Sequence, residues 1–346
     1  MKIKSIIYFA ARAAGLFALC RLMTRSRVRI LGYHGASLGD ESRYNPVLFI
    51  SAETFRRRVQ WLLKKGFNIV SLELAVNALS GKTDLGRLPT VMTFDDGWYS
   101  TAAHLVPVLA ESTLPCTLYL HTSHFENDWP VIAVTVNYMI WKAGRTAIQV
   151  HGVDTDVNGK YDLAENADRV SFHEKSCKWL AGSPATREIV IGRVHQLAKP
   201  MGLAIDDLDL DTRRFDYMSR DEVLQLAEQG CAVELHGHQH HYPVGDPVAF
   251  AEDLIACRKV IAGLGLPMPQ HYCYPSGSFD KGAAETLNQL DVKSATTCIP
   301  GLVSVPDDAS RRYFLPRFLD AEHISMLTFE AELSGFADLL RRAAGR

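Results

Sequence analysis

The sequence lacks the features that define several large classes of protein. It has no run of about 18 apolar residues, which excludes a multispan membrane protein. It has no internal repeat, and its 47% hydrophobic and 22% charged residues exclude a disordered or fibrous chain. The net charge of −2 excludes a globally basic nucleic-acid binder. What is left is a globular chain of 346 residues, long enough for one large domain or two ordinary ones.

Cysteine pairs with the spacing of metal or redox motifs are also missing. The chain has seven cysteines, an odd number, and none of them forms a Cys-x-x-Cys motif. Most lie within apolar stretches, where an unpaired cysteine behaves as a small buried hydrophobic residue. This usage favours a reducing compartment, so we expect a cytoplasmic protein, with export as the alternative.

Acidic side chains are absent from the first 39 residues, which hold seven bases. The rest of the chain carries a net charge of −9. We interpret residues 1–27 as a basic amphipathic helix with three alternative roles: packing on its own domain, lying on an anionic membrane surface, or serving as an export signal or anchor. Arg12 interrupts the apolar stretch, which disfavours an export signal. Peripheral contact with the inner face of the membrane is therefore an expectation alongside simple packing.

Residues 28–346 alternate short apolar stretches with amphipathic ones, which is the pattern of a parallel α/β fold. About seven or eight such repeats that close on themselves make a TIM-like barrel, with an open doubly wound sheet as the alternative. The expected strands are 28–33, 68–72, 90–94, 116–121, 232–235, 272–274, 294–297 and 313–315. The clearest expected helices are 53–65, 219–229, 249–264 and 281–290.

One long region departs from this alternation. Between about residues 125 and 214 the strand pattern disappears, and the sequence becomes polar and helix-like. The region is too long to be a bare loop. We therefore interpret it as a helical insertion that packs over one face of the barrel.

Two adjacent carboxylates follow one of the apolar strands, in the segment TFDDG at residues 93–97. Active sites of parallel barrels lie at the carboxyl ends of the strands. Neighbouring side chains at a strand end point in different directions, so Asp95 and Asp96 could have separate roles. Taken alone, the segment is more typical of a polar turn.

Four histidines lie within six residues after another apolar strand, in the segment ELHGHQHH at residues 234–241. Histidine is the commonest protein ligand for transition metals. With one carboxylate, two histidines would make a site that leaves positions open for water and substrate. His236 and His240 are separated by three residues, whereas the alternative pair, His238 and His241, is separated by two.

A third segment, HYCYPSGSF at residues 271–279, again ends an apolar stretch in a Pro/Gly turn. The order TFDDG, then His-x-x-x-His, then Tyr-Pro-Ser-Gly resembles the polysaccharide deacetylases, the NodB-homology domain of carbohydrate esterase family 4. The order and spacing match over residues 29–317. The segment LGYH at residues 31–34 and the long insertion resemble the bacterial branch found with exopolysaccharide genes.

The resemblance implies a distorted (β/α)7 barrel that removes N-acetyl groups from amino sugars of a polysaccharide or glycolipid. It implies that Asp96, His236 and His240 bind a divalent metal, usually zinc, although other transition metals suit the same ligands. Asp95 would be the general base. It would act on metal-bound water, whose pKa is lowered to about 7. The backbone N–H of Tyr274 could share the charge of the tetrahedral oxygen.

This chain departs from the family pattern in three places, one of which is Gly237, where a Ser or Thr usually follows the first histidine. Many members carry an arginine in the third segment to orient the base, but that position is Cys273, and Arg317 could supply the charge instead. The late Leu-x-His motif that provides the general acid in many members is missing from the sequence. His34, His271 and His323 are the candidates for this role.

Two other functions follow from the same residues. The chain could hydrolyse a small amide or formamide, with the insertion capping a compact pocket. The departures also suggest a catalytically inactive carbohydrate-binding protein. In the leading interpretation the partner is an N-acetylated glycan, and no nucleic acid is expected.

Overall fold

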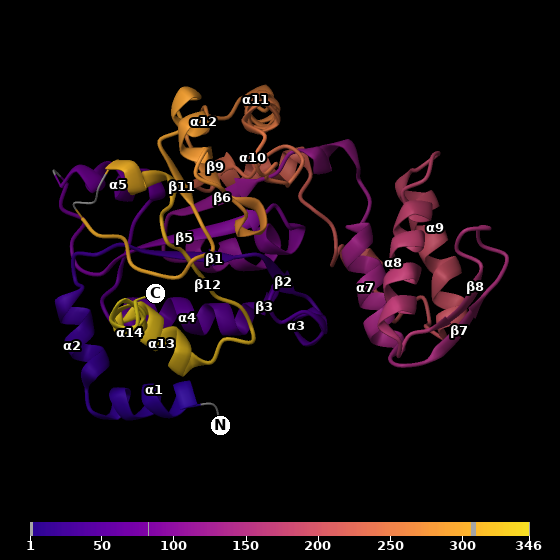
Figure 1. The fold of residues 1–346 in the computed structure, drawn as a ribbon, viewed down its shortest axis with the longest axis horizontal. Coiled ribbons are helices and arrows are strands. Elements are labelled where there is room, and N and C mark those ends of the chain that lie inside the picture. The colour runs from indigo at the N-terminus through magenta and orange to yellow at the C-terminus, as the bar shows by residue number, and fades with distance from the viewer. Residues whose placement is uncertain (1–2, 82, 306–308, 346) are drawn as a thin grey trace.

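A computed structural model describes residues 3–81, 83–305 and 309–345 of the chain, and Lys2, one of the seven N-terminal bases, lies outside these ranges. The main sheet (Figure 1) has eight parallel strands in the order β11-β10-β9-β6-β5-β1-β12, with β4 beside β5. In chain order these are β1 (Arg29–Tyr33), β4 (Asn68–Ile69), β5 (Pro89–Asp96), β6 (Cys116–Leu120), β9 (Cys231–Leu235), β10 (His271–Cys273), β11 (Ser294–Thr296) and β12 (Phe318–Leu319).

One chain segment joins the two ends of the curled sheet. β12 pairs with β1, and Leu315, just before β12, forms a parallel bridge with Thr296 of β11. The backbone N–H of Leu315 donates to the carbonyl oxygen of Ala295, and the N–H of Thr297 donates to that of Leu315, both at 2.9 Å. These contacts confirm the expected α/β fold with a curled, barrel-like parallel sheet.

The expected strand at residues 313–315 is wrong in its position. η7 (Ala309–Tyr313) is a 3-10 helix, and β12 begins only at Phe318. Pro316 has no N–H to donate to a ladder. Pairing with β11 therefore stops at Leu315, and pairing with β1 begins after the proline, at Phe318.

Helices cover the outside of the sheet, so the strands are buried on both faces. All eight residues of β5 and all five of β6 are buried. The four helices expected most clearly are present within two residues of their expected ends. The covering helices are α4 (Ala52–Lys64), α5 (Leu72–Asn77), α6 (Val106–Ala110), α10 (Arg220–Glu228), α11 (Pro247–Gly263), α12 (Ala283–Gln289), α13 (Met326–Leu333) and α14 (Phe336–Ala343).

The long insertion forms a separate lobe, here called the inserted lobe (residues 131–215). Its apolar core includes Val136, Phe172 and Val194, and the same cluster extends to Phe49 and Trp98, which lie outside the lobe. An antiparallel pair of strands corrects the expectation of helices alone. Figure 1 shows the lobe beside the barrel rather than flat across it. Its elements are α7 (Ile132–Ala143), β7 (Ala147–Val150), β8 (Gly159–Asp162), α8 (Asn166–Leu180) and α9 (Arg187–Ala198).

The lobe is joined to the barrel through an excursion between β1 and α4. This excursion contains the parallel pair β2 (Gly35–Ser37) and β3 (Phe49–Ser51), with α3 (Glu41–Tyr44) between them. Arg214 of the lobe donates to Asp40 and to Glu41, each at 2.6 Å. Arg214 and Glu41 are both buried, so removing either partner would leave an uncompensated buried charge where the lobe meets this excursion.

The N-terminal segment forms two helices instead of the single one expected, α1 (Ile3–Ala13) and α2 (Leu16–Met23). They pack on α13 and α14 through a small apolar cluster that includes Tyr8, Phe17 and Ala331. Among the described residues, no single helix has the length and apolar composition needed to cross a membrane. α1 and α2 meet these criteria only as a pair, and they are bent by 83° at the break between them.

Candidate metal and catalytic site

The two adjacent aspartates lie at the carboxyl end of β5, and both are buried. Asp96 has a φ of 75° and Gly97 a φ of 104°. Non-glycine residues seldom adopt this left-handed conformation, and such strain gathers at functional sites. The sharp turn sends the carboxylates to different partners, Asp95 to an arginine and Asp96 to two histidines.

Asp96, His236 and His240 converge on one point. Oδ1 of Asp96 lies 3.3 Å from Nε2 of His236 and 3.0 Å from Nε2 of His240. The three donor atoms lie within 4.8 Å of one another. The structure thus brings together the three residues predicted as ligands. The ring of His238 instead contacts the Thr122 hydroxyl, at 2.9 Å.

The hydrogen bonds around these residues suit a cation. Nδ1 of His236 lies 2.8 Å from the carbonyl oxygen of Cys273, which can only accept, so Nδ1 carries a proton. In the neutral ring, Nε2 then presents a lone pair toward the carboxylate of Asp96. Two electron-rich atoms this close repel each other unless a proton or a metal ion lies between them. The residues therefore fit a divalent metal, with a backbone carbonyl orienting one ligand.

Two further contacts hold the ligands in place. Trp98 Nε1 donates to Oδ2 of Asp96 at 2.9 Å, which leaves Oδ1 for the histidines. Asp253 accepts the backbone N–H groups of His238 and Gln239, each at 2.8 Å. At Gly237 a Cβ atom would lie 2.6 Å from the Asp253 carboxylate, so glycine is required for this approach. These hydrogen bonds therefore fix the position of the histidine loop relative to α11.

Asp95 forms a two-pronged ion pair with Arg317. The Nη1–Oδ1 and Nη2–Oδ2 distances are 2.5 and 2.7 Å. Burial alone would raise the pKa of Asp95, but the Arg317 charge outweighs it and holds the pKa below its usual value. The carboxylate is therefore ionised at neutral pH. A Cβ at Gly32 would lie 3.1 Å from the guanidinium carbon, so a glycine on β1 makes room for the arginine.

Cys273 occupies the position at which many polysaccharide deacetylases, the family that the sequence resembles, carry an arginine. Its Sγ is 3.9 Å from Oδ2 of Asp95. Asp95, His236 and Cys273 form a second group of close donor atoms. Burial raises the pKa of the Cys273 thiol well above its usual value, and Asp95 is already bound to Arg317. The set around Asp96 is therefore the better metal site.

Of the three histidines considered as the general acid, His34 lies at the site. Its Nε2 is 3.6 Å from Oδ2 of Asp95, and its side chain is 20% exposed. His271 is buried elsewhere and pairs with Glu73 at 2.8 Å. His323 is exposed and hydrogen-bonds a backbone carbonyl. Position alone selects His34.

The expected role of Tyr274 is contradicted by its hydrogen bonds. Its backbone N–H donates to the carbonyl oxygen of Thr296 at 3.2 Å, within the barrel wall. Its hydroxyl donates to the carbonyl oxygen of Tyr313 at 3.0 Å, and its ring is packed against Tyr272 and Phe279. Tyr274 is therefore a structural residue here, because the pairing of β10 with β11 continues to its backbone N–H.

Two supporting residues, Trp98 and Asp253, were missed by the reasoning from sequence, whereas His121 stood out only as a histidine after a strand with a packing role. The only signal for Trp98 was its position two residues after Asp96. His121 stacks on the ring of His240, with centroids 4.8 Å apart. Neither ring nitrogen of His121 has a hydrogen-bond partner among the described residues. Burial lowers its pKa well below the usual value, so a neutral ring supports the ligand.

Comparison with protein families gives one match. The model of the family described as polysaccharide deacetylase matches residues 198–295, which hold the histidine segment and the Tyr-Pro-Ser-Gly segment. A search of curated proteins found no significant match. The family match confirms the resemblance seen in the sequence motifs.

Several solved structures share the fold. A deacetylase from Streptococcus pyogenes, PplD, is 14% identical, with a TM-score of 0.58 over 90% of this chain and 99% of that one. IcaB from Ammonifex degensii is 17% identical, with a TM-score of 0.53 over 89% and 97%. A de-N-acetylase from Aggregatibacter actinomycetemcomitans is 16% identical, with a TM-score of 0.55 over 88% and 98%. At these identities the likeness establishes the fold.

Proposed function

We propose that the protein is a metal-dependent carbohydrate N-deacetylase, a hydrolase of C–N bonds other than peptide bonds. The observation that carries the proposal is the placement, at one barrel edge, of a His/His/Asp donor set beside a separate ionised carboxylate. The family match and the deacetylases among the structural neighbours support it. The substrate is an N-acetylated amino sugar of a polysaccharide or glycolipid, in exopolysaccharide synthesis.

Asp96, His236 and His240 would hold the metal, with zinc as the first choice for two imidazoles and one carboxylate. When bound, the ion supplies Lewis acidity that polarises the amide carbonyl and acidifies water. Trp98 orients the Asp96 carboxylate toward this position.

Asp95 is the proposed general base. It removes a proton from water as the water oxygen bonds to the carbonyl carbon of the N-acetyl group. His34, whose Nε2 lies 3.6 Å from Oδ2 of Asp95, donates a proton to the nitrogen as the C–N bond breaks. The products are acetate and a free amine. In this proposal Arg317 contacts neither the attacking water nor the substrate amide. It holds Asp95 ionised and in one orientation, so it is a positioning residue.

The ion pair between Asp95 and Arg317 also bears on the inactive-protein alternative. That alternative rests on the arginine missing from the third segment. Arg317 brings the same charge to the same carboxylate from the segment before β12. The charge is therefore supplied from another strand, which favours an active enzyme.

The test is acetate release from a panel of N-acetylated glycans by metal-reconstituted protein. We expect release that is lost in Asp95→Asn and in His236→Ala, and kept in Asp206→Asn, which changes an exposed carboxylate of the inserted lobe. Tightly bound metal without acetate release from any glycan would overturn the proposal. Release from small amides alone would replace it with the small-amide reading.

We further propose that α1 and α2 dock on the anionic inner surface of a membrane. Beside the face buried on the barrel, these helices expose large apolar side chains. Basic Lys4 and the half-exposed Arg12 lie among them. Apolar side chains bordered by bases suit the boundary between headgroups and acyl chains. The exposed apolar residues are Ile6, Ile7, Phe9, Leu16, Leu19, Leu22 and Met23, each at least 39% exposed.

Sedimentation of the full chain with vesicles tests this docking. We expect binding to vesicles that contain phosphatidylserine and little binding to neutral phosphatidylcholine vesicles. A Phe9→Ser and Leu22→Ser double variant should lose at least about tenfold in affinity, since each apolar side chain contributes roughly 1.5–3 kcal/mol when buried. Leu74→Ser, at an exposed apolar residue of α5, is the matched control. Equal sedimentation of all three proteins would overturn the docking.

A further inference from the structure

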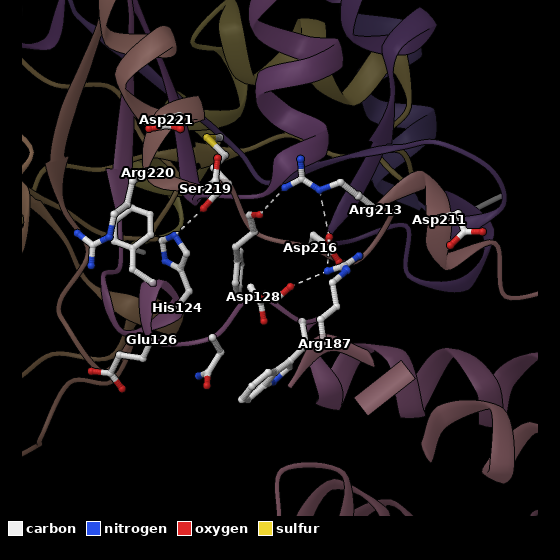
Figure 2. Close-up of a pocket in the computed structure, with 15 residues that line it drawn as sticks. His124, Glu126, Asp128, Arg187, Asp211, Arg213, Asp216, Ser219, Arg220 and Asp221 are labelled. Carbon is white, nitrogen blue, oxygen red and sulfur yellow. Dashed lines mark hydrogen bonds and ion pairs between the residues drawn. The ribbon is translucent and has the colours of Figure 1, made fainter. Parts of the chain in front are cut away.

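A cavity of about 840 Å³ lies between the barrel and the inserted lobe, and we call it the lobe cavity (Figure 2). Its wall combines the loop after β6 (residues 124–129), the segment before α10 (residues 216–221), and Arg187, Asp211 and Arg213 of the lobe. Cavities of this size are typical of small-molecule sites. The two bodies form it together, so a ligand held there would contact both.

Acidic side chains outnumber basic ones around the lobe cavity. His124, also in the wall, adds no charge at neutral pH, because burial lowers its pKa to about 4. The cavity therefore favours a cation over an anion. The charged residues of the wall are Glu126, Asp128, Asp211, Asp216 and Asp221 against Arg187, Arg213 and Arg220.

Two of the arginines are already neutralised within the protein. Oδ2 of Asp216 accepts from Arg187 at 2.9 Å and from Arg213 at 3.1 Å, and Figure 2 shows Asp216 next to both. Arg213 also pairs with both carboxylate oxygens of Glu222, at 2.5 and 3.0 Å. Asp128, Asp211, Asp221 and Glu126, all exposed, are left against the single charge of Arg220, so the local charge is negative.

Asp216 also has an unused acceptor. Its side chain is 4% exposed, and its second oxygen, Oδ1, has no hydrogen-bond partner among the described residues. A buried carboxylate oxygen without a partner is costly. A hydroxyl or ammonium donor in the cavity would satisfy it after a small side-chain shift.

Aromatic rings complete the wall. Phe125, Trp129 and Tyr217 line the cavity, and Arg220 already lies over the Phe125 ring at 4.7 Å. Ring faces offer broad apolar contact, and the partial negative charge of the π-face attracts cations. Aromatic faces beside carboxylates suit a ligand with apolar C–H faces, polar edges and positive charge.

The lobe cavity is one layer of side chains from the metal ligands. The ring of Tyr217 lies 4.6 Å from the ring of His121, which stacks on His240. Glu126 lies 3.4 Å from Nε2 of His238, in the same loop as both histidine ligands. A chain of linked sugars could therefore occupy the metal site and the lobe cavity together.

We propose that the lobe cavity binds a sugar unit that carries a free ammonium group, an already deacetylated unit of the same glycan. The inference rests on the proposed function, because the reaction itself converts a neutral N-acetyl group to an amine that is charged at neutral pH. One round of reaction then creates the group that the cavity recognises. The preferred substrate is a partly deacetylated chain, and deacetylation spreads from units already processed.

The experiment compares binding of two oligosaccharides of equal length, one fully N-acetylated and one partly N-deacetylated, by calorimetry. The protein is the metal-loaded full chain with Asp95→Asn, which prevents turnover. We expect the partly deacetylated oligosaccharide to bind about fivefold more tightly, and added salt to reduce the difference. Asp211→Asn with Asp221→Asn removes two of the exposed carboxylates of the wall and should reduce the preference, whereas Asp206→Asn, outside the cavity, should keep it.

The possible outcomes distinguish a failure of the cavity inference from a failure of the proposed function. Equal affinity for both oligosaccharides, together with acetate release by the wild-type protein, would overturn the cavity inference and leave the proposed function standing. A preference that is undiminished in the double variant, or that is reduced equally in Asp206→Asn, would also overturn it. A preference reduced only in the double variant, without acetate release by the wild-type protein, would support the cavity and overturn the deacetylase proposal.

Discussion

The barrel edge and the inserted lobe carry their functional residues in opposite ways. At the barrel edge, side chains from separated segments meet because parallel strands end there, and each is held by a short contact. In the lobe, α8 and α9 pack around an apolar core that also reaches Phe49 and Trp98. The lobe contributes Arg187, Asp211 and Arg213 to the wall of the lobe cavity.

This difference separates two tasks of an enzyme. Chemistry needs a few groups fixed to within fractions of an ångström, and strands buried on both faces provide that rigidity. Selection of a long ligand needs shape and charge over a wider area, which a lobe can supply without disturbing the strands. Substitutions in the barrel edge and the lobe should therefore have effects of different size and kind.

The largest expected effect is at Asp95. Asp95→Asn keeps the shape of the side chain but removes the proton acceptor, so kcat/KM for acetate release should fall by about 10²–10⁴-fold. The matched lobe substitution, Asp206→Asn, should leave the rate unchanged. Steady-state kinetics of both variants makes the comparison. Similar rates for the two would show that Asp95 is not the base.

The next effect distinguishes two histidines of one loop. His240→Ala removes a proposed ligand and should weaken zinc affinity by at least about 10²-fold, whereas His238→Ala should change it by less than about tenfold. Competition with a chromogenic chelator measures both. Stronger loss in His238→Ala would mean that the other pair of histidines holds the metal.

A smaller effect is expected where the barrel only supports the metal ligands. Trp98→Phe keeps an aromatic ring at this position but deletes the indole N–H that donates to Oδ2 of Asp96. Metal affinity should fall by about 10–100-fold, as is usual when a partner of a metal ligand is lost. If excess zinc restores the rate, the role of Trp98 is orientation of the ligand. An unchanged affinity would contradict this role.

The smallest effect on chemistry is expected deep in the lobe. Phe172 is fully buried against Tyr161. Phe172→Ala should destabilise the lobe by about 3–5 kcal/mol. Acetate release from a short N-acetylated substrate should change by less than about twofold below the unfolding transition. A loss as large as that of Asp95→Asn would show that the two bodies act as one catalytic unit.

Much of the barrel could be predicted because its pattern is local. Apolar stretches of strand length mark where each strand lies, and polar side chains directly after them must meet at one edge. This reasoning located the aspartate pair and the histidine segment, and the resemblance to the polysaccharide deacetylases selected Asp96, His236 and His240 as ligands. It misplaced the last strand, because Pro316 divides the closing segment. The residue before the proline pairs with β11, and the residues after it pair with β1.

The errors at the site have a similar cause. Whether the N–H of Tyr274 is free depends on how far β10 and β11 pair, which is a property of two segments 20 residues apart. The support from Asp253 and His121 likewise comes from α11 and β6, far from the histidine loop in sequence. Single-segment patterns hold no information about such partners.

The sequence by itself determined the fold class, the positions of most strands and the kinds of chemical group at their ends, because these follow from local hydrophobicity and residue type. Tertiary structure alone decided which of those groups meet. It brought Arg317 to Asp95, turned His238 away from Asp96, and opened the lobe cavity between the barrel and the inserted lobe. The reason is physical: an ion pair, a ligand set or a cavity depends on distances between segments, and those distances exist only after the chain has packed.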